Sequence, residues 1–392
     1  MFKSVLSLTL AAALGTASFG QTTLTAIPGE AAAAKYASIS QEILRAIEKG
    51  NEYLKSKQNP EGYWAQPSYP ALTALAVTAY MRDPANQGKP VPEYIRKGYD
   101  FILKSQKEDG SIFNRGMSSY NTAVCMMALL AANKEEYAPA ILKGRAYLIK
   151  QQNHFAPDNP YNGGIGYGDK QAPPIADLSN TSLALEAIYY SQKLAKDGKY
   201  GEQPDLDWNA ATEFINRCQQ NPAVNKEPWV SNDKSQLGGF VYRPGVSSAR
   251  DKKSAAFDKA EPPKAYGSMT YAGMQSLIYA NVDKNDPRVK LALKWLENSY
   301  SLDENPGMGV QGLYYYYQAM SKALSAMGID PLTLETGRKV DWRDELANKL
   351  ISIQKSDGSW VNTNNRWWEA DPVLVTSYCV LALEQLYHSI PR

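Results

Sequence analysis

The sequence predicts an all-α protein, a double ring of six outer–inner helix pairs, and three observations support this prediction. A motif in which glycine follows glutamine by four positions, and an aromatic residue follows the glycine by two, occurs near both ends of the chain. Amphipathic segments alternate with alanine-rich apolar segments between the motifs. Neither end of the array carries the polar capping repeat that an open array normally needs, so we expect the ring to close.

The motif predicts a structural role. Its two complete copies, and a third copy with isoleucine at the aromatic position, comprise Gln58, Gly62 and Trp64; Gln106 and Gly110; and Gln354, Gly358 and Trp360. The glycine stands where a helix C-cap or a tight turn requires a positive φ. The glutamine amide can bond nearby turn backbone groups, and the indole can pack against neighbouring repeats. We therefore expect the motif to hold the repeats together and to take no part in catalysis.

The segments that precede the motifs have the wide apolar stripe of a surface helix, as Ile95, Tyr99 and Ile102 show. Glycine recurs in them eight residues before a glutamine: Gly50, Gly98 and Gly144 precede Gln58, Gln106 and Gln152. Glycine in a helix interior costs about 1 kcal/mol relative to alanine. Its recurrence in register therefore predicts the close approach of a neighbouring helix.

The segments that follow the motifs are apolar on nearly all sides, as expected for helices buried between two layers. The predicted inner helices are 71–81, 119–132, 179–193, 269–280, 311–327 and 373–387, and their outer partners end near residues 58, 106, 152, 220, 300 and 354. Two of the turns between partners are enlarged, near 153–176 and 221–265. Inserts of that length are typical of functional lids or of disordered segments.

The N-terminus has the features of a secretory signal over residues 1–20. Lys3 gives the positive start, and the apolar core of about ten residues is too short to span a bilayer. We expect cleavage before Gln21 and export to the periplasm or out of the cell. Residues 21–40 are then a leader, and residues 41–392 form a single domain.

The composition argues against several classes of partner. The 42 Lys and Arg residues nearly balance the 40 Asp and Glu residues and form no basic cluster, so nucleic acid is not an expected partner. No later apolar run approaches roughly eighteen residues, so we do not expect a membrane-spanning segment. The two histidines lack a partner at metal-ligand spacing, and we expect neither a metal nor a cofactor. The apolar surroundings of Cys125, Cys218 and Cys379 predict buried thiols, and the sequence does not indicate the oligomeric state.

The motif units resemble the repeats of squalene–hopene cyclases and of protein prenyltransferase β subunits, over roughly residues 40–392. This resemblance implies an (α/α)6 toroid with a central ligand cavity that faces the N-terminal ends of the inner helices. The chain is similar above all to exported bacterial proteins with prenyltransferase/squalene-oxidase repeats. Four stretches support that similarity: 177–181, 266–271, 305–309 together with 314–317, and 365–371.

The catalytic motifs of both enzyme families are altered. The cyclases protonate their substrate with the middle carboxylate of an Asp-x-Asp-Asp-Thr motif, and the matching segment here is Asp177-Leu-Ser-Asn-Thr181. Ser179 stands at the place of the proton donor and Asn180 at that of its partner. A serine hydroxyl is not the strong acid that alkene protonation needs. The histidine of the prenyltransferase zinc site is matched by Val375, so we expect neither squalene cyclisation nor zinc-dependent prenyl transfer.

The resemblance places a cavity mouth at the N-terminal ends of the inner helices, where anions are also favoured. The residues predicted to bind a ligand there are Tyr120, Asn121, Asn180, Tyr266, Tyr271, Gln311, Tyr314, Tyr315, Trp367 and Trp368. The candidate catalytic carboxyls are Asp177, Glu369 and Asp371. Asp177 and Asp371 are equally suited to be helix N-caps.

Two classes of function follow from these residues. The first is a protein that binds, and as an enzyme would transform, an isoprenoid or other lipid in an aromatic cavity. The second is a periplasmic glycan-binding or polysaccharide-lyase-like toroid, because aromatic side chains also bind sugars. A purely scaffolding role stays open, because a fold does not determine a function. Cavity polarity distinguishes the first two classes.

Overall fold

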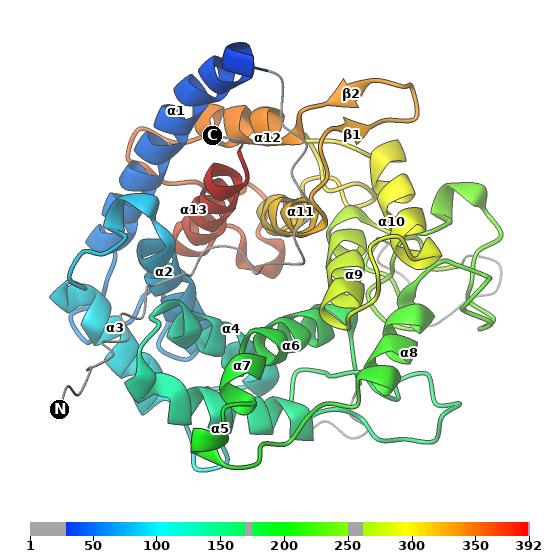
Figure 1. Ribbon diagram of the computed structural model, residues 1–392, viewed down its shortest axis with the longest axis horizontal. Coiled ribbons are helices and arrows are strands. Elements are labelled where there is room, and N and C mark those ends of the chain that lie inside the picture. Colours follow the sequence, from blue (N-terminus) through cyan, green and yellow to red (C-terminus); the bar gives the residue numbers. More distant parts are fainter. Residues whose placement is uncertain (1–28, 169–174, 250–261, 391–392) are drawn as a thin grey trace, which may run out of the picture.

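The computed structural model describes residues 29–168, 175–249 and 262–390. The predicted signal sequence lies outside these residues, as does part of each enlarged turn. Within the described residues the chain forms thirteen α-helices, five short 3₁₀ turns and one two-stranded hairpin. The prediction of an all-α protein is therefore confirmed (Figure 1).

The helices form an inner and an outer layer (Figure 1). The inner helices are α2 (Pro70–Arg82), α4 (Ser118–Ala131), α6 (Leu178–Tyr190), α9 (Gly267–Tyr279), α11 (Leu313–Met327) and α13 (Pro372–Ser389). The outer helices are α1 (Gly29–Ser56), α3 (Glu93–Lys104), α5 (Ala138–Lys150), α8 (Trp208–Cys218), α10 (Pro287–Asn298) and α12 (Trp342–Ser352). The short α7 (Gln192–Ala195) follows α6, and the antiparallel strands β1 (Leu332–Thr333) and β2 (Lys339–Val340) lie between α11 and α12.

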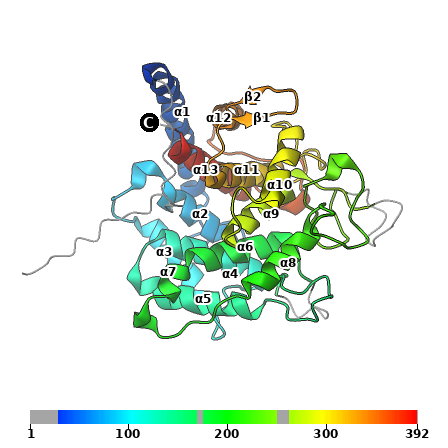
Figure 2. The same cartoon turned by 45° about the vertical axis from the view of Figure 1, so that its right-hand side comes forward.

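The inner helices contact one another in chain order, and the cycle of contacts closes. Each of α2, α4, α6, α9 and α11 packs against the next inner helix, and α13 packs against both α11 and α2. Figures 1 and 2 both show α11 beside α13. In the outer layer the first and last helices, α1 and α12, are also in contact. Segments from the two ends of the chain are thus neighbours.

A repeated glutamine contact links successive repeats. In five turns the glutamine amide donates at 2.7–3.2 Å to a glycine carbonyl of its own turn and to a carbonyl of the next outer helix or its N-cap. The glutamines, each with its two acceptors, are Gln58 (Gly62, Tyr94), Gln106 (Gly110, Ala140), Gln152 (Gly163, Asp207), Gln219 (Gly238, Arg288) and Gln354 (Gly358, Ala46). The last of these joins the final turn to α1. We call this arrangement the glutamine clamp.

Each clamped turn is also tied to its inner helix. The residue two positions after the motif glycine donates its backbone N–H to a threonine hydroxyl in the first turns of that helix, at 2.8–3.1 Å. The threonines are Thr73, Thr122, Thr181, Thr270 and Thr376. The motif glycine has a positive φ and leaves no room for a Cβ; at Gly62 that atom would lie 2.6 Å from a carbonyl oxygen of α3. Both outer and inner helices are therefore fixed by one short turn.

One junction lacks the clamp. At the end of α10 the glutamine position is occupied by Tyr300, whose hydroxyl donates to Glu345 Oε2 of α12 at 2.9 Å. In the other repeats a threonine joins the turn to the inner helix. Here the hydroxyls of Tyr316 and Tyr317 donate to the carbonyls of Ser301 and Leu302 in the turn. The junction between α10 and α12 is consequently held by side-chain contacts and not by a backbone-directed clamp.

The structure differs from the sequence predictions at several boundaries. Helix α1 begins at Gly29, within the segment 21–40, and Tyr36 of that segment is buried with its hydroxyl donating to Asp341 at 2.7 Å. Gln311 lies in the turn before α11, and the predicted helix 179–193 breaks after Tyr190. The three cysteines are free and buried, as expected.

Candidate functional site

At the starts of two inner helices, a side chain from another repeat accepts a backbone hydrogen bond. Asn121 Oδ1, on α4, accepts from the backbone N–H of Ala71 in α2 at 3.0 Å. Asn305 Oδ1 accepts from Ser268 of α9 at 2.9 Å. Because these caps satisfy helix N–H groups within the protein, few of those groups are left for an anionic ligand.

Two of the three candidate carboxyls also cap helices. Glu369 is 1 % exposed and accepts from the backbone N–H of Tyr315 in α11 at 2.8 Å and from Asn362 Nδ2 at 2.7 Å. Asp371 Oδ1 accepts from the backbone N–H of Val373 at 2.8 Å, at the start of α13. Both carboxylates are occupied by contacts that stabilise helix ends, and we assign both to helix capping.

Asp177 also caps a helix, but its burial shifts its pKa. Its Oδ1 accepts from the backbone N–H of Asn180 at 2.8 Å, and its Oδ2 accepts from Asn180 Nδ2 at 2.7 Å. Burial raises the pKa of this carboxyl to about 6, while hydrogen bonds from Asn180 and the Tyr242 hydroxyl and the charge of Arg243 act in the opposite direction. Asp177 is thus the candidate carboxyl that exchanges a proton near neutral pH.

A cluster of tyrosines from several inner helices lies next to Asp177. Polar side-chain interactions link Tyr315 on α11 with Ser179 on α6, and Tyr120 on α4 with Tyr378 on α13. The rings of Tyr315 and Tyr378 have centroids 6.0 Å apart. Tyr120 and Tyr315 keep part of their surface accessible, although burial raises the pKa of both. These four residues, the tyrosine cluster, join four inner helices at one place.

Other predicted ligand residues lie away from this cluster. Tyr271 is fully buried, and its ring packs 5.6 Å from that of Tyr316, on the side of α9 that faces α11. The Tyr314 hydroxyl donates to the carbonyl of Val361 at 3.2 Å in the turn before α13. Asn121 has its amide engaged in capping, and Gln311 contributes a backbone carbonyl to Asn305. Each of these four residues therefore makes contacts that stabilise the fold.

Two adjacent tryptophans are exposed on the turn before α13. Trp367 and Trp368 are 46 % and 40 % exposed, and both have positive φ, 54° and 65°. The Trp368 ring packs against Tyr69 with centroids 4.7 Å apart, and the Arg366 guanidinium lies 4.7 Å from the Trp367 ring centroid. Strained backbone at exposed aromatic residues is typical of ligand-contacting turns.

The structure adds residues that the sequence reasoning did not single out. Tyr242 accepts a backbone hydrogen bond from Leu178, the first residue of α6, at 2.8 Å, and its hydroxyl lies 3.5 Å from that of Tyr167. Arg243 follows it in a tight turn closed by reciprocal backbone bonds with Val246. Both come from the enlarged turns, where no periodicity marks the side chains that point inward. The one sequence feature that could have indicated them is the run Gly-Gly-Phe-Val-Tyr-Arg at residues 238–243, which interrupts an otherwise polar insert.

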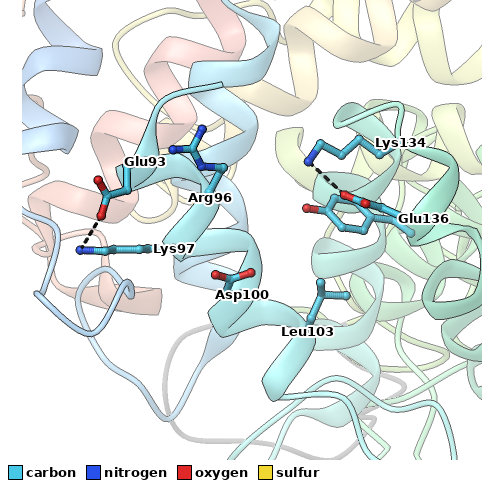
Figure 3. Close-up of a pocket in the computed structure, with 8 residues that line it drawn as sticks. Glu93, Arg96, Lys97, Asp100, Leu103, Lys134 and Glu136 are labelled. Atoms are coloured by element: carbon cyan, nitrogen blue, oxygen red, sulfur yellow. Dashed lines mark hydrogen bonds and ion pairs between the residues drawn. The ribbon is translucent and has the colours of Figure 1, made fainter. Parts of the chain in front are cut away.

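A hollow of about 660 Å³ lies elsewhere, in the outer layer between α3 and the segment before α5 (Figure 3). Glu93 and Lys97 line it as an exposed pair at 3.4 Å, and Lys134 and Glu136 form another at 3.0 Å. Charges of both signs already pair with each other there. Nothing in this lining favours one class of ligand, and we do not place the site in it.

Comparison with known proteins supports the fold. No protein-family model matches the sequence. The structure is similar to the type II terpene cyclase MstE from Scytonema in its apo form, with a TM-score of 0.53 and 10 % identity over 89 % of this chain and 99 % of that enzyme. Variants of MstE in complex with merosterolic acid A, its product, and with geranylgeranyl dihydroxybenzoate, its substrate, each give a TM-score of 0.53 at 10 % identity, covering 90 % of this chain and 99 % of theirs.

At this level of identity the likeness establishes the fold alone. The chain has an all-α, terpene cyclase-like fold. Across the residues that the structure describes, no helix combines the length and the hydropathy needed to cross a membrane.

Proposed function

We propose that the protein is an exported (α/α)6 toroid that binds an isoprenoid or similar lipid at the N-terminal ends of its inner helices. The closed cycle of contacts from α2 to α13 supports the toroid. The predicted signal sequence supports export. The observation on which the proposal rests is the tyrosine cluster, in which side chains of α4, α6, α11 and α13 meet.

The chemistry of this cluster suits a polyene. Aromatic faces offer large apolar contact area, and their hydroxyls add a polar end to each ring. Burial raises the pKa of Tyr120, Tyr315 and Tyr378, so the hydroxyls stay neutral at physiological pH. A neutral aromatic wall binds apolar chains and also stabilises positive charge that develops on them. MstE, which shares the fold, is described with a geranylgeranyl substrate.

We assign binding as the primary function and Asp177 as the acid for any transformation. A carboxyl with a pKa of about 6 is a weak acid toward an unactivated alkene. Both carboxylate oxygens of Asp177 also accept hydrogen bonds from Asn180. We therefore expect no cyclisation of squalene, and a substrate with a more basic group would be needed for turnover.

The test is a binding titration of purified protein with geranylgeraniol, followed by native mass spectrometry. Tyr120→Ala and Tyr315→Ala should each weaken binding by about tenfold or more, equivalent to ~1.4 kcal/mol. Tyr190→Ala is the matched control, because Tyr190 is 43 % exposed at the opposite end of α6. The affinity of the Tyr190→Ala variant for geranylgeraniol should stay within about twofold of that of the wild type.

Two results would contradict the proposal. One is equal weakening by the cluster variants and the control. The other is binding of oligosaccharides in the same assay with no binding of geranylgeraniol, which would favour the glycan class. Incubation with squalene and analysis of the products completes the test, because hopene-type products would show an acid that we have not identified.

A further inference from the structure

Arg243 differs from the other arginines of the described chain. The remaining arginines that are buried or half-buried each have a carboxylate within 4.0 Å: Arg82 with Glu384, Arg145 with Asp205, Arg217 with Glu227, Arg288 with Asp286 and Arg343 with Asp330. Arg243 is half-buried, and no described carboxylate lies within that distance. Its Nε is inaccessible to solvent and has no hydrogen-bond partner among the described residues, as is also true of the Nε atoms of Arg145 and Arg343, whose guanidinium groups do have a carboxylate nearby. A buried N–H that loses solvent without gaining a hydrogen-bond partner is destabilising.

The surroundings of Arg243 do not supply the missing partner. The carboxyl that its charge affects is that of Asp177, whose two oxygens already accept hydrogen bonds from Asn180. The turn itself is firmly placed, because the backbone N–H of Leu178 donates to the carbonyl of Tyr242. The unpaired guanidinium is therefore held at the start of α6.

A second arginine without a carboxylate partner lies in another turn. Arg366, in the turn before α13, is exposed and stacks on Trp367 with 4.7 Å from guanidinium carbon to ring centroid. Its charge opposes the effect of burial on the pKa of Tyr266, and the charge of Asp177 also acts on that tyrosine. Tyr266 precedes α9, and its backbone N–H donates at 3.3 Å to the carbonyl of Phe240, three residues before Arg243. The turn that carries Arg243 is therefore bonded to the tyrosine on which the charge of Arg366 acts. No described carboxylate pairs with Arg366 within 4.0 Å either.

We propose that Arg243 and Arg366 bind the anionic head group, a phosphate or a carboxylate, of the lipid whose chain contacts the tyrosine cluster. A guanidinium presents a planar fork of donors that matches either anion. The anion completes the hydrogen bonding of the buried Nε and offsets the two unpaired charges. This inference rests on the proposed lipid-binding function and narrows it from any isoprenoid or lipid to an anionic amphiphile.

The experiment compares four probes on the wild-type protein by isothermal titration at low and moderate salt. The probes are farnesyl monophosphate, farnesoic acid, farnesol and inorganic phosphate. At least one prenyl anion should bind about tenfold or more tightly than farnesol, and the advantage should shrink as salt increases. The phosphate and carboxylate arms identify which head group is preferred.

Single substitutions of the two arginines then test whether they cause the preference for a prenyl anion. Arg243→Gln and Arg366→Gln should each remove most of the advantage of the prenyl anion while the affinity for farnesol stays within about twofold. Arg45→Gln is the control, since Arg45 is an exposed arginine of α1 in the outer layer. If Arg243→Gln does not fold, Arg243→Lys tests the same point, because it keeps the charge and loses the fork.

The outcomes separate the two proposals. If farnesol binds as tightly as both prenyl anions, or if the arginine variants keep the preference, the head-group inference is wrong and lipid binding stands. If none of the prenyl probes binds, the proposed function itself fails. If inorganic phosphate competes with farnesyl monophosphate in the wild type but not in Arg243→Gln, the inference is supported.

Discussion

Replacing Trp360 with alanine tests whether the motif residues hold the ring together. Trp360 is fully buried, and its Nε1 donates to the carbonyl of Leu350 in α12 at 2.8 Å. Its ring is so close to Gly50 of α1 that a Cβ there would lie 3.1 Å from it. Its backbone N–H donates to Thr376 of α13. One residue therefore contacts α1 and α12 through its side chain and α13 through its backbone.

The expected loss follows from this burial. A buried tryptophan removes roughly 200 Å² from water, worth about 5 kcal/mol at ~25 cal/mol per Å². Core replacements of Phe or Trp by alanine cost about 3–5 kcal/mol, and the carbonyl of Leu350 loses its indole donor, worth about 1 kcal/mol. We expect Trp360→Ala to lower the free energy of unfolding by about 4–5 kcal/mol.

Urea unfolding followed by far-ultraviolet circular dichroism measures this loss without relying on tryptophan fluorescence. Trp367→Ala is the control, because that side chain is 46 % exposed, and it should cost less than about 1 kcal/mol. Trp360→Phe should fall between the two. Equal unfolding midpoints for Trp360→Ala and Trp367→Ala would refute the structural role that we assign to the motif.

Three further predictions concern the clamp, the buried acid and the unclamped junction. Gln354→Leu leaves the carbonyls of Gly358 in the turn and of Ala46 in α1 without this donor and should cost about 1–2 kcal/mol in urea unfolding, whereas Gln311→Leu should be nearly neutral; equal costs would contradict the clamp. Burial raises the pKa of Asp177 from 3.8 to about 6, so its contribution to stability is full below pH ~4 and is lost as pH rises through 6, by about 3 kcal/mol. Asp177→Asn keeps an N-cap and should lack that part of the decline, and an unchanged pH profile would disprove the assignment. Hydrogen exchange should be faster in α12 than in α3, because α12 has no clamp to α10; equal protection of the two helices would argue that the tyrosine contacts replace it fully.

Much of the fold was predictable because its contacts repeat. Predicted inner helices begin and end within a few residues of the observed ones, since the same turn chemistry recurs at each start. Two clamps could not be found by spacing. In them Gln152 and Gln219 are separated from Gly163 and Gly238 by inserted residues, so the four-residue interval disappears although the contacts are the same.

The candidate site was predictable only in part, for geometric reasons. Chain direction predicted that Tyr120, Asp177 and Tyr315 would lie near inner-helix starts. It could not decide which way a tyrosine points. Successive helical residues turn by about 100°, so Tyr314 and Tyr315 face different neighbours. Arg243 carried no periodic signal, because it lies in an irregular insert and its significance depends on a missing partner.

Two positions at or next to the proposed head-group site depart from the repeat. The clamp uses backbone carbonyls, which every repeat supplies regardless of sequence, and this leaves inner-helix side chains free to vary. Departures occur at Trp367, which has a left-handed backbone that costs on the order of 1–3 kcal/mol, and at Arg243, which has no carboxylate. Both are less favourable for stability than an ordinary turn would be. Local choices that oppose stability are expected where a ligand compensates for them, so the same two positions should become more protected when an anionic lipid binds.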